Sequence, residues 1–168
     1  HLAGNRPTIY KAVNGVLQRH RSEPTVSSGI LSSVRASSGI HRVRLLPLLP
    51  EIGGADALEL LLESTREGDS PVRNAALMTA AQWPTAEPAS ALLDLAKSSA
   101  NPTDRTLALR ASARLAAAEN DPAKKLNLLQ RTMSLASRPD EKRLALNELA
   151  ALGTEPALNL VLDTIKDP

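Results

Sequence analysis

A two-residue step recurs through this chain at a spacing of 34 residues. The step is Gly54-Ala55, Pro88-Ala89, Pro122-Ala123 and Pro156-Ala157, and a leucine follows four residues after each first member. This period constrains the fold more than any local pattern, because a unit of this length is one supersecondary element that must stack on its neighbours. Proline is favoured in the first turn of a helix, so we expect each step to begin a helix.

A second series of helix starts lies between these steps. Pro71, Pro102 and Pro139 each precede or open an Ala/Leu-rich run. Apolar residues along these runs recur every three to four positions, which is typical of one helix face, and alternation with a period of two is nowhere sustained. The sequence therefore predicts an all-α fold built from helical hairpins, with about ten helices in five antiparallel pairs.

Two of the expected helices contain residues that weaken helices. Pro47 and Pro50 should kink or split one of them, because proline removes a backbone hydrogen bond. The Ser-rich stretch 27–38 weakens another, and Gly53-Gly54 is predicted to be a turn between helices. The helices are expected at 8–19, 25–36, 40–52, 55–67, 71–83, 88–98, 102–117, 122–135, 140–152 and 156–166.

The composition excludes several functional classes. One Trp, one Tyr and no Phe cannot form the aromatic platforms of single-strand binders, and we expect Trp83 to lie in the core. The chain has no Cys, which excludes disulfides, a thiolate nucleophile and Cys-ligated metals. No apolar run approaches the ~20 residues that cross a bilayer, so no membrane association is expected.

The residue patterns of catalytic and cofactor sites are also missing from the sequence. His1, His20 and His41 have no second ligand at helical spacing, so they do not predict a metal site. The chain has neither a Gly-rich phosphate loop nor a Gly-x-Ser-x-Gly elbow. We therefore predict no catalytic residue, no metal, no cofactor and no small-molecule substrate.

Charge is distributed unevenly along the chain, although the net charge is only +2. Residues 1–44 have seven basic and one acidic side chain, residues 45–100 have three and eight, and residues 101–168 have ten and nine. Phosphate binding needs a continuous basic surface, so this distribution argues against nucleic acid as the partner.

The run Asp69-Ser70-Pro71-Val72-Arg73-Asn74-Ala75-Ala76 resembles the helix-start signature of HEAT-like repeats, the short bacterial kind found in phycobilisome lyases. Val43-Arg44 is its reduced form in the preceding unit. The resemblance implies a right-handed α-α superhelix, an armadillo-like solenoid. It also implies one HEAT-like domain over 1–168, with clear repeats in 40–168 and a degenerate repeat in 7–39. In such repeats aspartate caps a helix and arginine bonds to the next repeat, which gives a structural ladder of Asp69, Arg73, Asp104 and Arg105.

The second helix of each hairpin lines the concave wall in HEAT-like arrays, and its charged face is the candidate partner surface. This surface comprises Asp56, Glu59, Glu63, Asp94, Lys97, Lys124, Asn127 and Arg131. We expect a non-enzymatic scaffold that binds a protein or a neighbouring domain of the same polypeptide. The resemblance leaves two alternatives, a HEAT-like DNA glycosylase and a bilin lyase.

The last residues suggest that the repeats continue. Lys166-Asp167-Pro168 is similar to Gly68-Asp69-Ser70-Pro71, which opens an earlier helix, and the last helix has the apolar stripe Leu158, Val161, Leu162 and Ile165. Terminal repeats normally have a polar outer face. We therefore expect these residues to be a segment of a larger multidomain bacterial protein.

Overall fold

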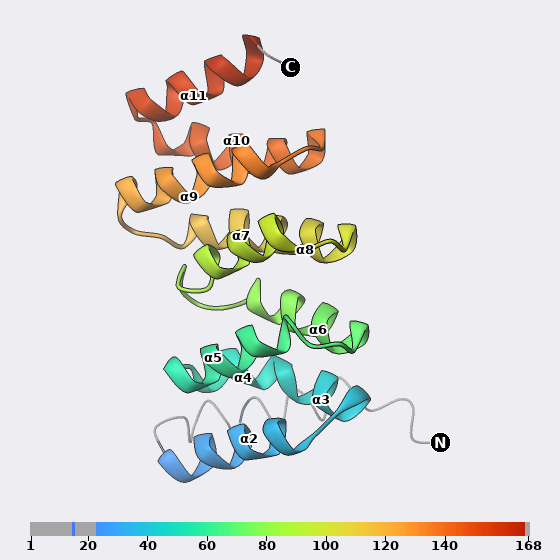
Figure 1. Ribbon diagram of the computed structural model, residues 1–168. Coiled ribbons are helices and arrows are strands. Elements are labelled where there is room, and N and C mark those ends of the chain that lie inside the picture. Colours follow the sequence, from blue (N-terminus) through green and yellow to red (C-terminus); the bar gives the residue numbers. More distant parts are fainter. Residues whose placement is uncertain (1–14, 16–22, 167–168) are drawn as a thin grey trace. The chain divides into compact units, whose positions relative to one another are not determined.

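The computed structural model describes residue 15 and residues 23–166, with side chains as far as Thr164. All regular secondary structure in this part of the chain is helical (Figure 1), which confirms the all-α prediction. None of the described helices is long and apolar enough to cross a bilayer. The expected helix 8–19 lies outside the described residues except for residue 15, which is helical. The chain divides into two compact units, residues 1–79 and 80–168, and each is described by itself.

The first unit contains short helices, and α6 ends one residue beyond it. They are α2 (Pro24–Ala36), α3 (Gly39–Leu45), the 3₁₀ helix η1 (Leu46–Leu48), α4 (Leu49–Ile52), α5 (Ala55–Ser64) and α6 (Ser70–Ala80). The core of this unit includes Val34, Leu46, Leu49 and Leu61, which are completely buried.

The expected helix 40–52 is split, as its two prolines predict. α3 ends at Leu45, a single 3₁₀ turn contains Pro47, and α4 contains Pro50. Each proline lies in the first turn of the element that follows the break, where its missing N–H has no helical partner to lose.

The Ser-rich helix α2 forms despite its weak propensity. The hydroxyl groups of Ser28 and Ser33 donate to the carbonyls of Thr25 and Gly29 at 3.1 and 2.8 Å, so they are satisfied within the helix. Val34 on the opposite face is completely buried. Burial of this face offsets the low propensity of serine.

Two helix ends differ from the expectation by three residues. α5 ends at Ser64 instead of 67, where the Thr65 hydroxyl donates to the Leu62 carbonyl at 2.6 Å. α6 ends at Ala80 instead of 83, because Pro84 disfavours the helical conformation at the residue before it. The Gly53-Gly54 turn is confirmed, with positive φ angles of 64° and 83° that glycine adopts without strain.

The second unit contains longer helices. They are α7 (Ala89–Ser98), α8 (Pro102–Ala117), α9 (Pro122–Leu135), α10 (Pro139–Leu152) and α11 (Glu155–Lys166). α8 and α9 have the expected bounds. Asn101 and Asp121 cap them, since each side chain accepts hydrogen bonds from two backbone N–H groups of the first turn.

Small side chains fill the core between α7 and α8. Ala89 and Ala96 of α7 and Ala108 and Ala111 of α8 are at most 2% exposed, alongside buried leucines from both helices. Each helix also packs on its counterpart in the next hairpin, α7 on α9 and α8 on α10. Trp83 is 5% exposed, which confirms its place in the core.

The apolar stripe of α11 is only partly covered. Leu158 and Leu162 remain 57% and 43% exposed, whereas Ala157 is completely buried. The side chain of residue 165 lies outside the described part of the chain.

Candidate partner-binding groove

A groove with a volume of about 430 Å³ lies on the second unit between α7 and α9. We call it the α7–α9 groove. It includes three residues of the predicted partner surface, all from α9. Its lining residues are Ala86, Ser90, Glu119, Ala123, Lys124, Asn127, Leu128 and Arg131.

Helix periodicity decides which side chains face this groove. Leu92 and Leu93 of α7 and Leu128 and Leu129 of α9 are buried. The polar residues lie on either side of these leucine pairs in the sequence, on the remaining face of each helix. The floor of the groove is therefore apolar, with alanine and leucine side chains, and its rim is polar.

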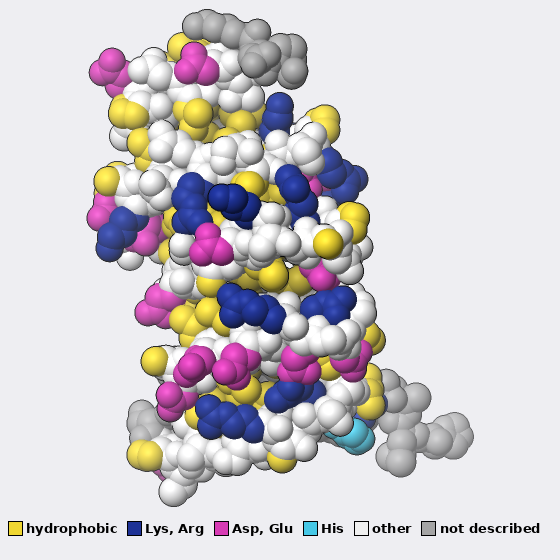
Figure 2. Space-filling view, in the orientation of Figure 1, with side chains coloured by type: hydrophobic (Ala, Val, Ile, Leu, Met, Phe, Trp, Pro, Cys, Tyr) yellow, Lys and Arg dark blue, Asp and Glu magenta, His cyan; other side chains and the backbone are white. Residues whose placement is uncertain are grey.

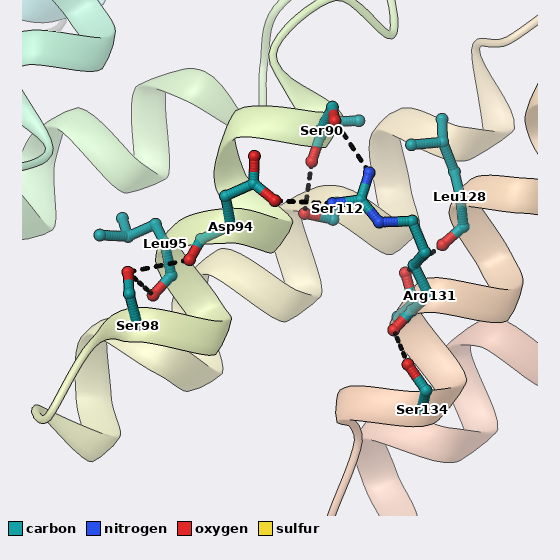
Figure 3. Close-up of polar contacts among 10 residues, drawn as sticks. Ser90, Asp94, Leu95, Ser98, Ser112, Leu128, Arg131 and Ser134 are labelled. Atoms are coloured by element: carbon teal, nitrogen blue, oxygen red, sulfur yellow. Dashed lines mark hydrogen bonds and ion pairs between the residues drawn. The ribbon is translucent and has the colours of Figure 1, made fainter.

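Arg131 connects the two walls of the groove. Figure 3 shows its guanidinium reaching from α9 toward Ser90 and Asp94 of α7. It donates to the Ser90 hydroxyl at 2.8 Å and to the Asp94 carboxylate at 2.7 Å. The Arg131 and Asp94 side chains are 36% and 68% exposed, so this ion pair contributes at most about 1 kcal/mol of stability. Its larger effect is to hold the guanidinium in one place.

Lys124 and Asn127 form the remaining polar rim on α9, and both are exposed. Among the described residues, no ion pair involves Lys124. The neighbouring Lys125 turns away, because its Nζ atom lies 3.6 Å from Glu148 of α10. The groove thus offers one ammonium group, one amide, one fixed guanidinium and the carboxylate of Glu119 to a ligand.

Three residues of the predicted surface lie on α5, in the first unit. Asp56, Glu59 and Glu63 are exposed, and the two glutamates line a hollow of about 420 Å³ together with Ala55, Leu58, Leu62 and Arg66. In Figure 2 a row of acidic side chains lies over α5, and basic side chains gather over α9. The charged residues of α5 are thus all acidic and those of α9 all basic, although Arg66 lines the hollow beside α5 and Glu119 lines the groove beside α9.

The structure separates the other predicted surface residues. Asp94 lies beside the α7–α9 groove and contacts it through Arg131. Lys97 is exposed in the last turn of α7 and does not line the groove.

The predicted ladder residues lie at helix starts. Arg73 donates to the carbonyls of Glu67 and Gly68, at 2.8 and 2.7 Å, in the turn before α6. The ion pair between Arg42 and Glu67 also stabilises this turn. Asp69 is exposed at the start of α6, with its Oδ2 atom close to Gly39. The arginine bonds in this region fix the turn that joins α5 to α6.

In the second unit, Asp104 is 5% exposed in the first turn of α8. Arg105 forms its bond within its own hairpin rather than to the next repeat, since its guanidinium donates to the Leu135 carbonyl of α9 at 2.7 Å. Leu135 is the last residue of α9, so Arg105 satisfies a carbonyl that the helix leaves without a partner.

The most buried polar groups of the second unit have structural roles. The Ser112 hydroxyl is completely buried and donates within α8 and to the Ala89 carbonyl of α7. Glu141 is 3% exposed and accepts three hydrogen bonds at the start of α10. In the part of the chain that the structure describes, no group of three or more His, Asp or Glu side chains could hold a metal ion.

The sequence reasoning missed Glu119 as a lining residue. It lies in the turn between α8 and α9, where its carboxylate accepts from the Asp121 N–H at 3.0 Å. Helical periodicity does not extend into a turn, so it gave no signal for this residue. An acidic residue two positions before a helix cap was the only local indication.

Comparison of the chain with family models, with curated proteins and with solved structures finds no significant match. The residues of the two units are therefore the basis for any functional inference.

Proposed function

We propose that this protein is a non-enzymatic binding scaffold, and that the α7–α9 groove receives a segment of a protein partner or of a neighbouring domain. One observation carries the proposal. Lys124, Asn127 and Arg131, predicted as partner residues from their spacing, line one groove with an apolar floor. A polar rim around an apolar centre is the usual anatomy of a protein-binding site.

The repeat organisation gives this groove its context. In our proposal the hairpins stack as a right-handed HEAT-like superhelix, in which the second helices form one wall. The packing of α7 on α9 and of α8 on α10 within the second unit supports this arrangement, because repeat arrays bury their cores against nearest neighbours.

A protein fits the groove better than a nucleic acid does. The acidic groups Asp94 and Glu119 lie at the groove beside Lys124 and Arg131, so the local charge is mixed. A polyanion needs several uncompensated basic groups along its path. A polypeptide can match a mixed rim and place an apolar side chain on the floor, which fixes its register more than its affinity.

Selection of peptides displayed on phage by the full chain tests the proposal. We expect enriched peptides whose binding weakens at least about tenfold when Lys124→Glu and Arg131→Glu are combined. The matched control is the double change Arg114→Glu and Arg143→Glu, which alters the net charge equally at two exposed positions away from the groove.

Two results would contradict the proposed function. One is that the selected peptides bind the groove variant and the control variant equally well. The other is tight binding of duplex DNA at about 0.15 M salt, where exposed charges are screened beyond about 8 Å. Circular dichroism of both variants verifies that they are folded.

A further inference from the structure

α5 and α9 are equivalent helices of the repeat, and their charges are opposite. The steps that precede them, Gly54-Ala55 and Pro122-Ala123, are 68 residues apart, which is twice the period. α5 contains three carboxylates and no basic residue, whereas α9 contains three basic residues and no acidic residue. The charged residues at the same scaffold position are therefore all acidic in one unit and all basic in the other.

The charge is inverted at two of three corresponding positions, and the third position changes from a carboxylate to a neutral amide. A shift of 68 residues converts each acidic position of α5 into a hydrogen-bond donor of α9. The corresponding positions are Asp56 and Lys124, Glu59 and Asn127, and Glu63 and Arg131.

Arg66 lines the hollow beside the acidic face, but among the described residues it forms no ion pair with that face. Within the part of the chain that the structure describes, no ion pair involves Asp56, Glu59 or Glu63. Their spacings of three and four residues bring like charges together on one side of the helix, which is unfavourable in isolation. A basic surface from outside would relieve this repulsion.

We infer that the occupant of the α7–α9 groove is α5 of a second copy of this chain. The inference rests on the proposed function, since it names the partner of the same groove. In a dimer with a two-fold axis, each copy supplies one acidic helix and one groove, so the same contact forms twice. The carboxylates of α5 would meet Lys124 and Arg131 at the rim of the groove, and the net charge of +2 produces little repulsion between copies.

The lengths of the two faces match. In each set the first and last residues are seven positions apart, or about 10.5 Å at 1.5 Å per residue. Because both ends of each set are charged, acid meets base whichever way the helices run, and Glu59 faces the amide of Asn127. Leu58 and Leu62, half-buried beside the acidic row, then lie over the apolar floor of the groove.

Sedimentation velocity over a range of protein concentrations tests this inference. We expect a species of twice the chain mass of 17.8 kDa, and a dissociation constant that rises about tenfold or more in high salt. Two double variants are compared with the wild-type chain. One combines Glu59→Lys with Glu63→Lys, and the other combines Lys124→Glu with Arg131→Glu.

Mixing the two variants gives the sharpest result. Each variant alone has two faces of the same sign, so its dissociation constant should rise at least about tenfold. In an equimolar mixture both contacts again pair opposite charges, and a one-to-one heterodimer should form with nearly wild-type affinity. A structural defect or a general charge effect could not produce this recovery.

The inference is overturned if the wild-type chain is monomeric at low salt and high concentration, or if the mixture stays monomeric. Assemblies that grow beyond the dimer would overturn the two-fold form. If either variant proves unfolded by circular dichroism, the milder pair Glu63→Gln and Lys124→Gln replaces it, with weaker dimerisation expected in each. A monomeric chain that still selects groove-dependent peptides would refute the dimer and leave the proposed function in place.

Discussion

Replacing Glu141 by alanine should destabilise the second unit by about 2–4 kcal/mol. The carboxylate is 3% exposed at the start of α10. It accepts from the backbone N–H groups of Ser137 and Arg138 at 3.2 Å each, and from the Thr106 hydroxyl of α8 at 3.2 Å. The substitution thus removes a helix cap and a connection between two hairpins at once.

The magnitude follows from these three hydrogen bonds. Hydrogen bonds to a charged group contribute about 1.5–3 kcal/mol each, and loss of a cap costs about 1 kcal/mol. The two N–H groups regain water in part, because the turn that contains them is exposed, so the total is well below the sum. Thr106→Val removes only the contact with α8, and we expect it to cost about 1 kcal/mol.

Urea unfolding, followed by circular dichroism and by the fluorescence of Trp83, measures these effects. Trp83 is the only tryptophan and lies in the core of the same unit. The control is Glu148→Ala, which removes a carboxylate 3.6 Å from Lys125 in a partly exposed pair and should cost less than about 1 kcal/mol. An equal cost for Glu141→Ala and Glu148→Ala would refute the reasoning.

Three further predictions concern single residues. Leu129→Ala should cost about 2–5 kcal/mol in urea unfolding, since Leu129 is completely buried; a cost below about 1 kcal/mol would contradict the assigned core. Asn101→Ala should lower the free energy of unfolding by about 1 kcal/mol, because α8 loses its cap. Asn101→Asp should retain most of the stabilisation by this cap. The hydrogen bond from Arg110 lowers the pKa of Asp140 below 3.8, so its ionised form favours folding. This stabilisation is present above the unfolded pKa of Asp140 and is lost as pH falls through its folded pKa. Asp140→Asn should therefore destabilise the protein at neutral pH and leave its stability nearly unchanged in acid. Urea unfolding at both pH values measures this difference.

The sequence could predict the helices because proline marks their starts. Pro102, Pro122 and Pro139 each begin a helix in the structure, and the pair Pro47 and Pro50 splits one where expected. Helix ends were less predictable, since they depend on local competition. The hydroxyl of Thr65 at the end of α5 is an example that periodicity does not encode.

The candidate groove was predictable only in part. Helical spacing placed Lys124, Asn127 and Arg131 on one face, but it could not show that Arg131 would pair with Asp94, 37 residues earlier. That pairing depends on the distance and angle between α7 and α9, which arise from side chains on their buried faces. Periodicity predicts which residues share a face of one helix, whereas the shape of a groove depends on how two helices pack.

The alanine-rich seam between α7 and α8 makes the second unit sensitive to mutation in one direction. Ala89, Ala96, Ala108 and Ala111 have almost no side chain to lose, so truncation there removes little packing. Any enlargement must instead push two closely packed helices apart, which typically costs about 1–3 kcal/mol. Alanine scanning would not detect this seam, because its residues are already alanine. Larger residues, even valine, should therefore be rejected here, whereas glycine should cost mainly the roughly 1 kcal/mol of its lower helix propensity.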